Sequence, residues 1–297
     1  MSAAVAIAAG LGSALAYGAG TAGQHAVAYT GRADAGRLLD LTRNPRWLLA
    51  TAGDVVGVVL QVLALANGAV VLVQPLLVLS LPVAVLLRSW FGALRPSRAD
   101  LGNCAVLVGG LGLFFALLGE PGRGRVIGAQ VTAWVAVAAV TAGVLAIAAT
   151  RDRSPVPRAV TFGVVAGCWF GVVGVLVEAV SSVWEGAGLA GFGRAEGLVP
   201  LVSALALAGA AYLLVQVGFQ LGPLGASFPA NLILDPVVAV VLGAALLGEH
   251  VRLGPGRLLG YLACVALLAW AAVRLAAPTP VDLAAGPPSG VGARPAS

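Results

Sequence analysis

The chain has 297 residues, of which 60% are hydrophobic and only 10% are charged, and its mean hydropathy is +0.99. These values lie far outside the range of soluble globular domains and indicate a polytopic membrane protein. The formal charge of +5 comes from arginine alone, and most arginines stand in short loops between apolar segments, which indicates membrane topology and excludes a nucleic-acid partner.

Nine apolar segments are long enough to span a bilayer as helices. In chain order they cover residues 3–29, 47–65, 69–87, 101–118, 130–149, 159–180, 198–217, 224–247 and 258–274. Short glycine-containing turns at 67–68 and 221–223 predict two tight antiparallel hairpins. No basic segment opens the chain, so we expect no cleaved signal peptide, and the Pro-, Gly- and Ala-rich residues 278–297 are predicted to form a disordered tail.

Arginine counting predicts the orientation. The loops and terminus on one side of the membrane hold twelve arginines, whereas those on the other side hold five. Because arginine-rich loops stay in the cytoplasm, the N-terminus is predicted outside and the C-terminus inside a bacterial inner membrane.

A glycine followed by prolines seven and fourteen positions later occurs twice, starting at Gly68 and at Gly222. The two copies of this pattern predict four proline helix breaks, at Pro75, Pro82, Pro229 and Pro236. A shift of 154 positions relates the copies and also places Gly20 on Gly174 and Gln24 on Glu178. The chain therefore reads as an internal duplication.

The duplication divides the chain into a first repeat at 1–118, a linking helix with its loops at 119–157, a second repeat at 158–277 and the cytoplasmic tail at 278–297. Because a single unpaired span separates the repeats, the second lies inverted in the membrane. Inverted repeats with interrupted helices are typical of secondary transporters, whose substrate site lies between the repeats near the midplane. We therefore expect a cavity lined by the first three spans of each repeat.

The repeated hairpins with Pro75 and Pro229, and the stretch from Asp235 to Gly254, resemble the drug/metabolite transporter superfamily of the EamA type over about residues 5–275. The nine spans and the stretch at 43–76 look most similar to the branch that includes the NIPA-like magnesium transporters. Trp47, Gly53-Asp54 and Val73-Gln74-Pro75 are the matching points. The branch has Gly-Glu where this chain has Gly-Asp, and it has Asn where this chain has Gly57.

This resemblance implies a permease that moves a small metabolite or amphiphile by alternating access, with a divalent cation such as Mg²⁺ as the alternative substrate. A non-transporting scaffold subunit is the rival from another class. The sequence shows no hydrolase triad, zinc spacing, phosphate loop or dinucleotide fingerprint, so we expect neither enzymatic activity nor a cofactor. The expected partners are a small-molecule or ion substrate, the lipid bilayer and a second copy in a homodimer.

Polar residues within the apolar segments are the candidates for substrate or ion coupling, because a charge at the membrane midplane must be paired, protonated or functional. The principal candidates are Asp54 and Asp235. The others are Asn231, Gln74, Gln24 and Glu178, of which Glu178 is placed near the outer end of its helix. The alternative for each is an interhelical hydrogen bond that only holds the bundle together.

Three further patterns concern packing. Trp47, Trp90, Trp184 and Trp270 stand near predicted helix ends and are interpreted as interface anchors. The spacing Gly163-x3-Gly167-x3-Gly171 is typical of close helix contacts in membranes. Glu249 follows the eighth span and is interpreted as a solvated pairing or a helix cap.

Overall fold

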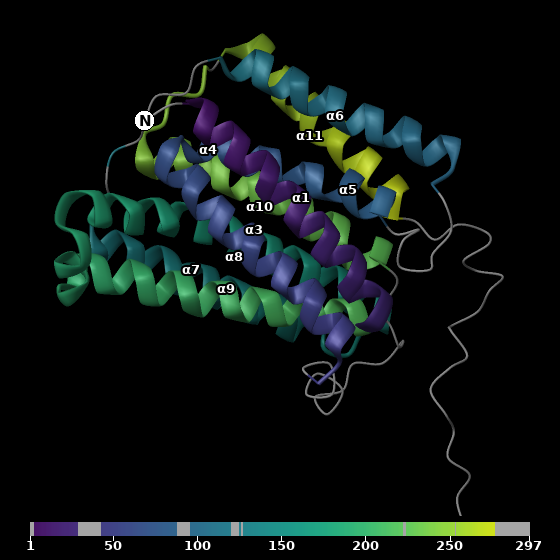
Figure 1. Cartoon of the computed structure of the whole chain (residues 1–297), viewed down its shortest axis with the longest axis horizontal. Helices are drawn as coiled ribbons and strands as arrows, with labels where there is room; N and C mark the ends of the chain where they lie inside the picture. The colour runs from purple at the N-terminus through teal and green to yellow at the C-terminus, as the bar shows by residue number, and fades with distance from the viewer. Residues whose placement is uncertain are drawn as a thin grey trace, which may run out of the picture.

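The computed structural model describes residues 3–28, 43–87, 96–119, 125, 127–221, 224–252 and 254–276. Within these ranges every regular element is helical, and nine spans are long and apolar enough to cross a membrane (Figure 1). The predicted all-α, multi-pass membrane fold is therefore confirmed. The tail at 278–297 and Trp90 lie outside the described residues.

The elements are named as in Figure 1. The first half holds α1 (Ala3–Ala28), α3 (Pro45–Asn67), α4 (Val70–Leu76), the 3₁₀ turn η1 (Leu77–Leu79), α5 (Ser80–Leu87) and α6 (Arg98–Leu118). The second half holds α7 (Ala129–Thr150), α8 (Pro155–Ala187), the 3₁₀ turn η3 (Gly188–Gly193), α9 (Ala195–Leu221), α10 (Leu224–Leu242), the π-helical turn η4 (Gly243–Leu247) and α11 (Pro255–Ala276).

Local sequence signals explain where several helices begin. Asn44 caps α3 by accepting from the backbone N–H groups of Arg46 and Trp47, and Pro45 takes the first helical position. Ser97 and Asp100 form a reciprocal capping box at the start of α6. These side chains satisfy backbone donors that the first helical turn leaves free.

The prolines act differently in the two copies. After Pro75 the third span tightens into η1, and α5 then continues with Pro82 in its first turn. Pro229 and Pro236 lie within α10, which stays helical from Leu224 to Leu242. Each removes one N–H donor without ending the helix. The irregular turn of this span comes later, in η4.

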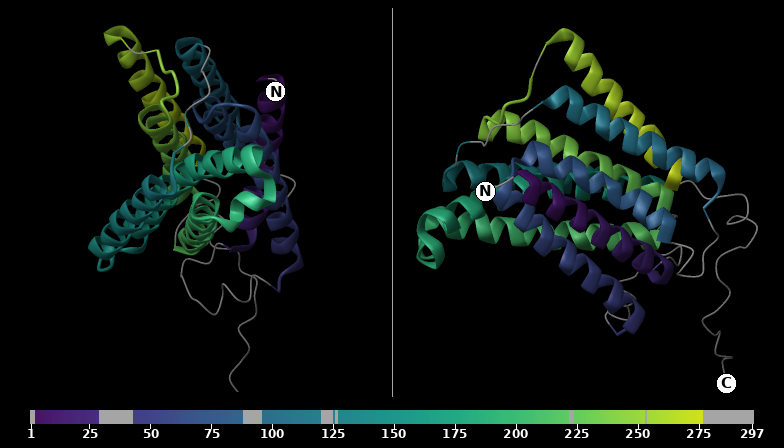
Figure 2. Two further views of the ribbon diagram at one scale, coloured as in Figure 1. Left: turned by 90° about the vertical axis from the view of Figure 1, so that its left-hand side faces the viewer. Right: turned by 45° about the horizontal axis from the view of Figure 1, so that its top comes forward.

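The helices pack in corresponding pairs in the two halves of the chain. In the first half α1 contacts α3 and α5, and in the second half α8 contacts α9 and α10. The fourth and ninth spans, α6 and α11, contact each other across the halves and lie together at the upper edge of Figure 1. Figure 2 shows this pair standing apart from the rest of the bundle. The repeat boundaries stay a prediction.

Glycine makes the closest helix contact in the molecule possible. Gly163, Gly167 and Gly171 of α8 lie against the backbone of α10, so that a Cβ atom at Gly167 would stand 2.6 Å from the carbonyl oxygen of Asn231. On the other side of the bundle, a Cβ atom at Gly57 of α3 would stand 2.8 Å from the ring of Tyr17. Small residues allow this approach where lipid gives little hydrophobic drive for helix association.

Candidate functional site

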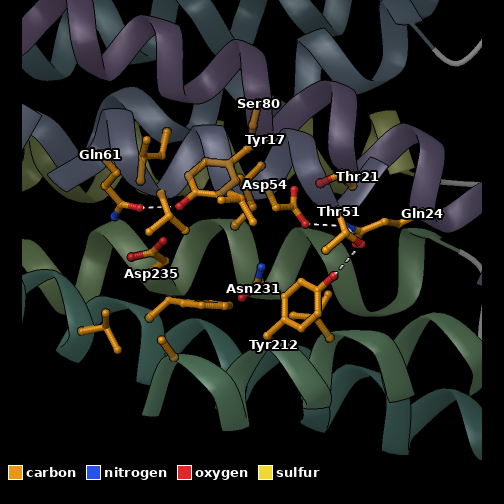
Figure 3. Close-up of a pocket in the computed structure, with 18 of the residues that line it drawn as sticks. Tyr17, Thr21, Gln24, Thr51, Asp54, Gln61, Ser80, Tyr212, Asn231 and Asp235 are labelled. Atoms are coloured by element: carbon orange, nitrogen blue, oxygen red, sulfur yellow. Dashed lines mark hydrogen bonds between the residues drawn. The ribbon is translucent and has the colours of Figure 1, made fainter. Parts of the chain in front are cut away.

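A cavity of about 390 Å³ lies between the two halves of the bundle. Its walls come from six spans: α1, α3, the third span at Leu77 and Ser80, α8, α9 and α10. These are the first three spans of each predicted repeat, so the expected cavity is confirmed. Its polar lining residues are Tyr17, Thr21, Gln24, Thr51, Asp54, Gln61, Ser80, Tyr212, Asn231 and Asp235 (Figure 3).

Asp54 forms part of the α3 wall. It lies nine residues after Pro45, about 14 Å along a helix of 1.5 Å rise per residue, and is therefore well inside the membrane. Gln24 of α1 donates its side-chain N–H to Asp54 Oδ2 and to Thr51 Oγ1. Gly20 faces the carboxylate and leaves room for it between the two helices. Asp54 is thus held by its own half of the chain.

Asp235 and Asn231 lie one helical turn apart on α10 and form part of the opposite wall. Asp235 lies eleven residues after Leu224, about 16 Å along the helix, which is close to the middle of a 30 Å hydrocarbon layer. Its Oδ1 atom is buried and accepts no hydrogen bond from any residue that the structure describes, and the same holds for Asn231 Oδ1. Asp235 therefore offers a carboxylate oxygen without a protein donor.

Tyr17 links the two walls. Its ring lies between Asp54 and Asp235 in Figure 3, and both carboxylates act on it electrostatically. Its hydroxyl donates to Gln61 Oε1 at 2.7 Å, so the phenol is fixed to α3 and its oxygen is turned away from Asp54. The Tyr17 ring thus lies beside the space between the carboxylates.

A chain of buried hydrogen bonds closes the end of the cavity near Gln24. Gln216 of α9 donates to Gln24 Oε1 at 2.7 Å, and the indole N–H of Trp47 donates to Gln216 Oε1 at 3.4 Å. Thr51 and Tyr212 add a hydroxyl contact of 3.3 Å between α3 and α9. This end of the cavity is thus joined across the two halves, and it lies on the side that the arginine counts predict to be cytoplasmic.

The same chain corrects the interpretation of Trp47. Its side chain is only 7% exposed and contacts α9, whereas Trp184 and Trp270 are about half exposed, as interface residues should be. A tryptophan near a helix end is typical of the membrane interface, but the indole N–H here finds a buried glutamine that lies 169 residues away in sequence.

Two predicted site residues lie outside the cavity lining. Gln74 is fully buried on α4 and accepts from Gln61 Nε2 at 3.4 Å, with Gly174 of α8 against its amide. Glu178 is half-buried, and because α8 continues to Ala187 it lies nine residues before the helix end rather than near it. Asp54, Asp235, Asn231 and Gln24 are brought together.

The lining residues that the sequence did not single out include three small hydroxyl residues: Thr21, Thr51 and Ser80. Hydroxyl side chains in membrane helices often bond their own backbone, so their sequence positions alone give little signal. Thr21 and Thr51 each lie three residues from a candidate, Gln24 and Asp54 respectively, and so share its helix face.

The cavity contains acidic side chains. Among the described residues, its lining includes two aspartates and no arginine or histidine. No group of three or more His, Cys, Asp or Glu side chains suited to a metal ion occurs among the residues that the structure describes. A ligand that enters this cavity meets two carboxyl groups and aromatic rings.

Glu249 lies outside the cavity and has a structural role. Its two carboxylate oxygens accept from the backbone N–H groups of Val70 and Val71 at 2.8 and 2.9 Å, so it caps the start of α4 from the other half of the chain. It is buried, not solvated. Burial raises the pKa of Glu249 above its ordinary value, and the two N–H donors act in the opposite direction.

Comparison with known proteins gives one informative relative. The chain is 29% identical over 248 residues to an uncharacterized protein of Corynebacterium glutamicum, and the aligned region covers 80% of this chain and 83% of that protein. No protein-family model matches the chain, and no solved structure matches it. The alignment extends over most of both chains, so the relative is expected to share the whole bundle and not one part of it.

Proposed function

We propose that the protein is a membrane transporter of the drug/metabolite transporter type, which moves a small metabolite or amphiphile by alternating access. The observation that carries the proposal is the cavity between the two halves, which six spans line and to which five of them contribute polar side chains within the membrane. Buried polar groups are costly in lipid, so a chain that gathers them around an open space has a use for them.

The hydrogen-bond pattern supports movement of one half against the other. At the Gln24 end, the halves are joined by the hydrogen bonds of Gln216 with Gln24 and Trp47 and by the contact between Thr51 and Tyr212. Each neutral hydrogen bond contributes only about 1 kcal/mol net. Ligand binding beside Gln24 is thus able to compensate for their loss, so that the cavity opens on this side.

Solute counterflow in liposomes containing the purified protein tests the proposal. The panel holds amino acids, nucleobases, organic amines and Mg²⁺, and one class is expected to accumulate. Asp54→Asn and Asp235→Asn should abolish the accumulation while the variants remain folded. Accumulation of Mg²⁺ alone would replace the metabolite substrate by a divalent cation. If no solute moves and both variants assemble normally, the protein is a scaffold and the proposal fails.

The proposal includes the location. We place the protein in a bacterial inner membrane with the N-terminus outside and the C-terminus in the cytoplasm, because the arginine-rich loops lie on the side of the C-terminus. In this orientation the Gln24 end of the cavity faces the cytoplasm, and the structure corresponds to a state that is closed on that side.

A further inference from the structure

We infer that the cavity binds a protonated amine with an apolar body, and that Asp235 is the residue that holds its charged nitrogen. This inference rests on the proposed function for the movement of the ligand, but its binding site stands on contacts of its own. The resemblance implies a small metabolite, an amphiphile or a divalent cation and names no organic amine, and the relative is uncharacterized.

The two carboxyl groups of the cavity, of Asp54 and Asp235, differ in their hydrogen-bond partners. Asp54 already accepts from Gln24 and stands beside Thr51. Asp235 Oδ1 is buried without a donor, although Asp235 borders the cavity. A buried polar atom without a partner is costly, and the cost disappears when a ligand supplies an N–H donor. Vacancies for a hydrogen-bond donor are therefore at Asp235 Oδ1 and, one helical turn away, at Asn231 Oδ1, and only Asp235 is acidic.

A positive charge on the ligand suits the two acidic side chains. The described residues that line the cavity include no arginine or histidine, and the chain contains no lysine. The salt bridge between Arg151 and Asp152 is exposed and lies outside the cavity. Burial disfavours the charged form of a carboxyl group unless a cation is near, so an ammonium ligand gains an ion pair with Asp235 that a neutral ligand lacks, and an anionic ligand is disfavoured.

Aromatic rings surround the same space. Tyr17 lies between the two carboxylates (Figure 3), and the remaining rings of the lining are Phe170, Tyr212, Phe219 and Phe228. The face of an aromatic ring attracts an ammonium group within about 6 Å of its centre, and more strongly where water is excluded. The cavity thus combines a carboxylate with ring faces, as an ammonium group requires.

The remaining walls favour an organic body. Val55, Val58 and Val62 on α3 and Val173 and Val177 on α8 belong to the lining, and the volume of about 390 Å³ falls in the range of small-molecule sites. A bare divalent cation needs six or more oxygen ligands and gains nothing from valine walls. An apolar chain or ring attached to the amine fills this part of the cavity.

The lack of a donor at Asp235 Oδ1 also distinguishes between classes of cationic ligand. An amine that keeps at least one N–H group donates to the Asp235 carboxylate, and such charge-assisted bonds are shorter and stronger than neutral ones. A quaternary ammonium group has the charge but no donor, so Oδ1 stays unsatisfied. Primary, secondary and tertiary amines are therefore expected to bind more tightly than the quaternary compound with the same body.

Titration calorimetry on the purified wild-type protein in nanodiscs tests this inference. The probes are alkyl and arylalkyl amines of increasing length, phenylethylamine among them, each with a quaternary, a neutral alcohol and a carboxylate analogue. We expect an amine to bind, the quaternary analogue to bind about tenfold more weakly, and the alcohol and carboxylate about a hundredfold more weakly. Failure of every amine to bind, or equal binding of a neutral analogue, overturns the inference.

Variants then locate the site. Asp235→Asn should weaken binding of the amine by about tenfold to a hundredfold and remove the preference over the alcohol. Asp152→Asn makes the same charge change at an exposed position and should leave binding unchanged. Equal effects of the two would contradict a site at Asp235. If Asp235→Asn does not fold, the analogue series in the wild type still decides the question.

Counterflow in liposomes separates this inference from the proposed function. Amine binding that depends on Asp235, without accumulation of any amine, refutes transport and leaves the binding site standing. Accumulation of a neutral or anionic solute, together with no amine binding, refutes the amine site and leaves the transporter standing.

Discussion

Replacing Gly167 by alanine tests the contact that holds the acidic wall of the cavity. The added Cβ atom would stand 2.6 Å from the carbonyl oxygen of Asn231, 2.9 Å from its Cα atom and 3.0 Å from Leu234 Cβ. Two of these three atoms belong to the backbone, so no side-chain rotation relieves the overlap. α10 must move away from α8, and Asn231 moves with it.

Two opposing effects decide the magnitude. Alanine is the better helix former by about 1 kcal/mol, whereas overpacking of a filled interior costs about 1–3 kcal/mol. Because the overlap is with the backbone of a second helix, the steric cost is expected to win. Gly167→Ala should therefore lower the free energy of unfolding by up to about 2 kcal/mol.

The assay is thermal unfolding of the purified protein in detergent, with Gly209→Ala as the matched control. Gly209 is exposed within α9, and a Cβ atom there would meet nothing within 4 Å, so its replacement should cost no stability. Gly163→Ala, whose Cβ atom would stand 2.1 Å from the carbonyl oxygen of Ser227, should be at least as damaging as Gly167→Ala. Equal stability of all three variants would refute the close contact between α8 and α10.

Two further predictions use the buried acids. The first is Glu249→Gln. Because the pKa of Glu249 is raised in the folded state, its contribution to stability is complete below the ordinary pKa of 4.5 and is lost as pH rises through the folded-state pKa. Across that pH range the wild type should therefore lose stability relative to the variant, and the opposite slope in thermal unfolding would contradict the assignment. Asp235→Asn should leave the ligand-free protein as stable as the wild type, or up to about 3 kcal/mol more stable, because it removes a buried carboxylate whose Oδ1 lacks a donor. A large loss of stability in the same assay would show that Asp235 is structural.

The nine spans are predictable from the sequence because hydropathy and length are local properties. Contacts between helices could be predicted only where the contacting residues recur at a regular spacing in the sequence. The spacing of Gly163, Gly167 and Gly171 predicted a close contact, and the structure confirms it, but the spacing does not name α10 as the partner. The sixth span was predicted at 159–180, whereas α8 begins at Pro155 and runs to Ala187.

The sequence predicted which acidic residues belong to the site but not which residues contact one another. Asp54 and Asp235 stand out in any apolar helix because charges there are rare, and both line the cavity. Trp47 was assigned to the membrane interface and Glu249 to a solvated pairing or a helix cap. Glu249 is a cap, but neither its partner, the start of α4, nor Gln216 as the partner of Trp47 was predicted, since both are distant in sequence. Such contacts depend on which helices become neighbours, and no local pattern encodes that.

Asp54 and Asp235 differ in their surroundings, and we expect them to have different roles in the cavity. Asp54 belongs to a chain of bonds that runs through Gln24 and Gln216 to Trp47, so a change at Asp54 reaches the contact between the halves. Asp235 has no such connection, but its helix is fixed against α8 by backbone contacts at Gly167 and Gly171. A ligand in the space beside Tyr17 that contacts both carboxyl groups would thus be held by Asp235 on α10. The same ligand would disturb the hydrogen bonds of Asp54 on α3, which lead to the contact between the halves. Under the proposed alternating-access mechanism, this arrangement would couple occupancy of the cavity to opening at the Gln24 end, because the bonds of Asp54 and Gln24 lead to the contact between the halves.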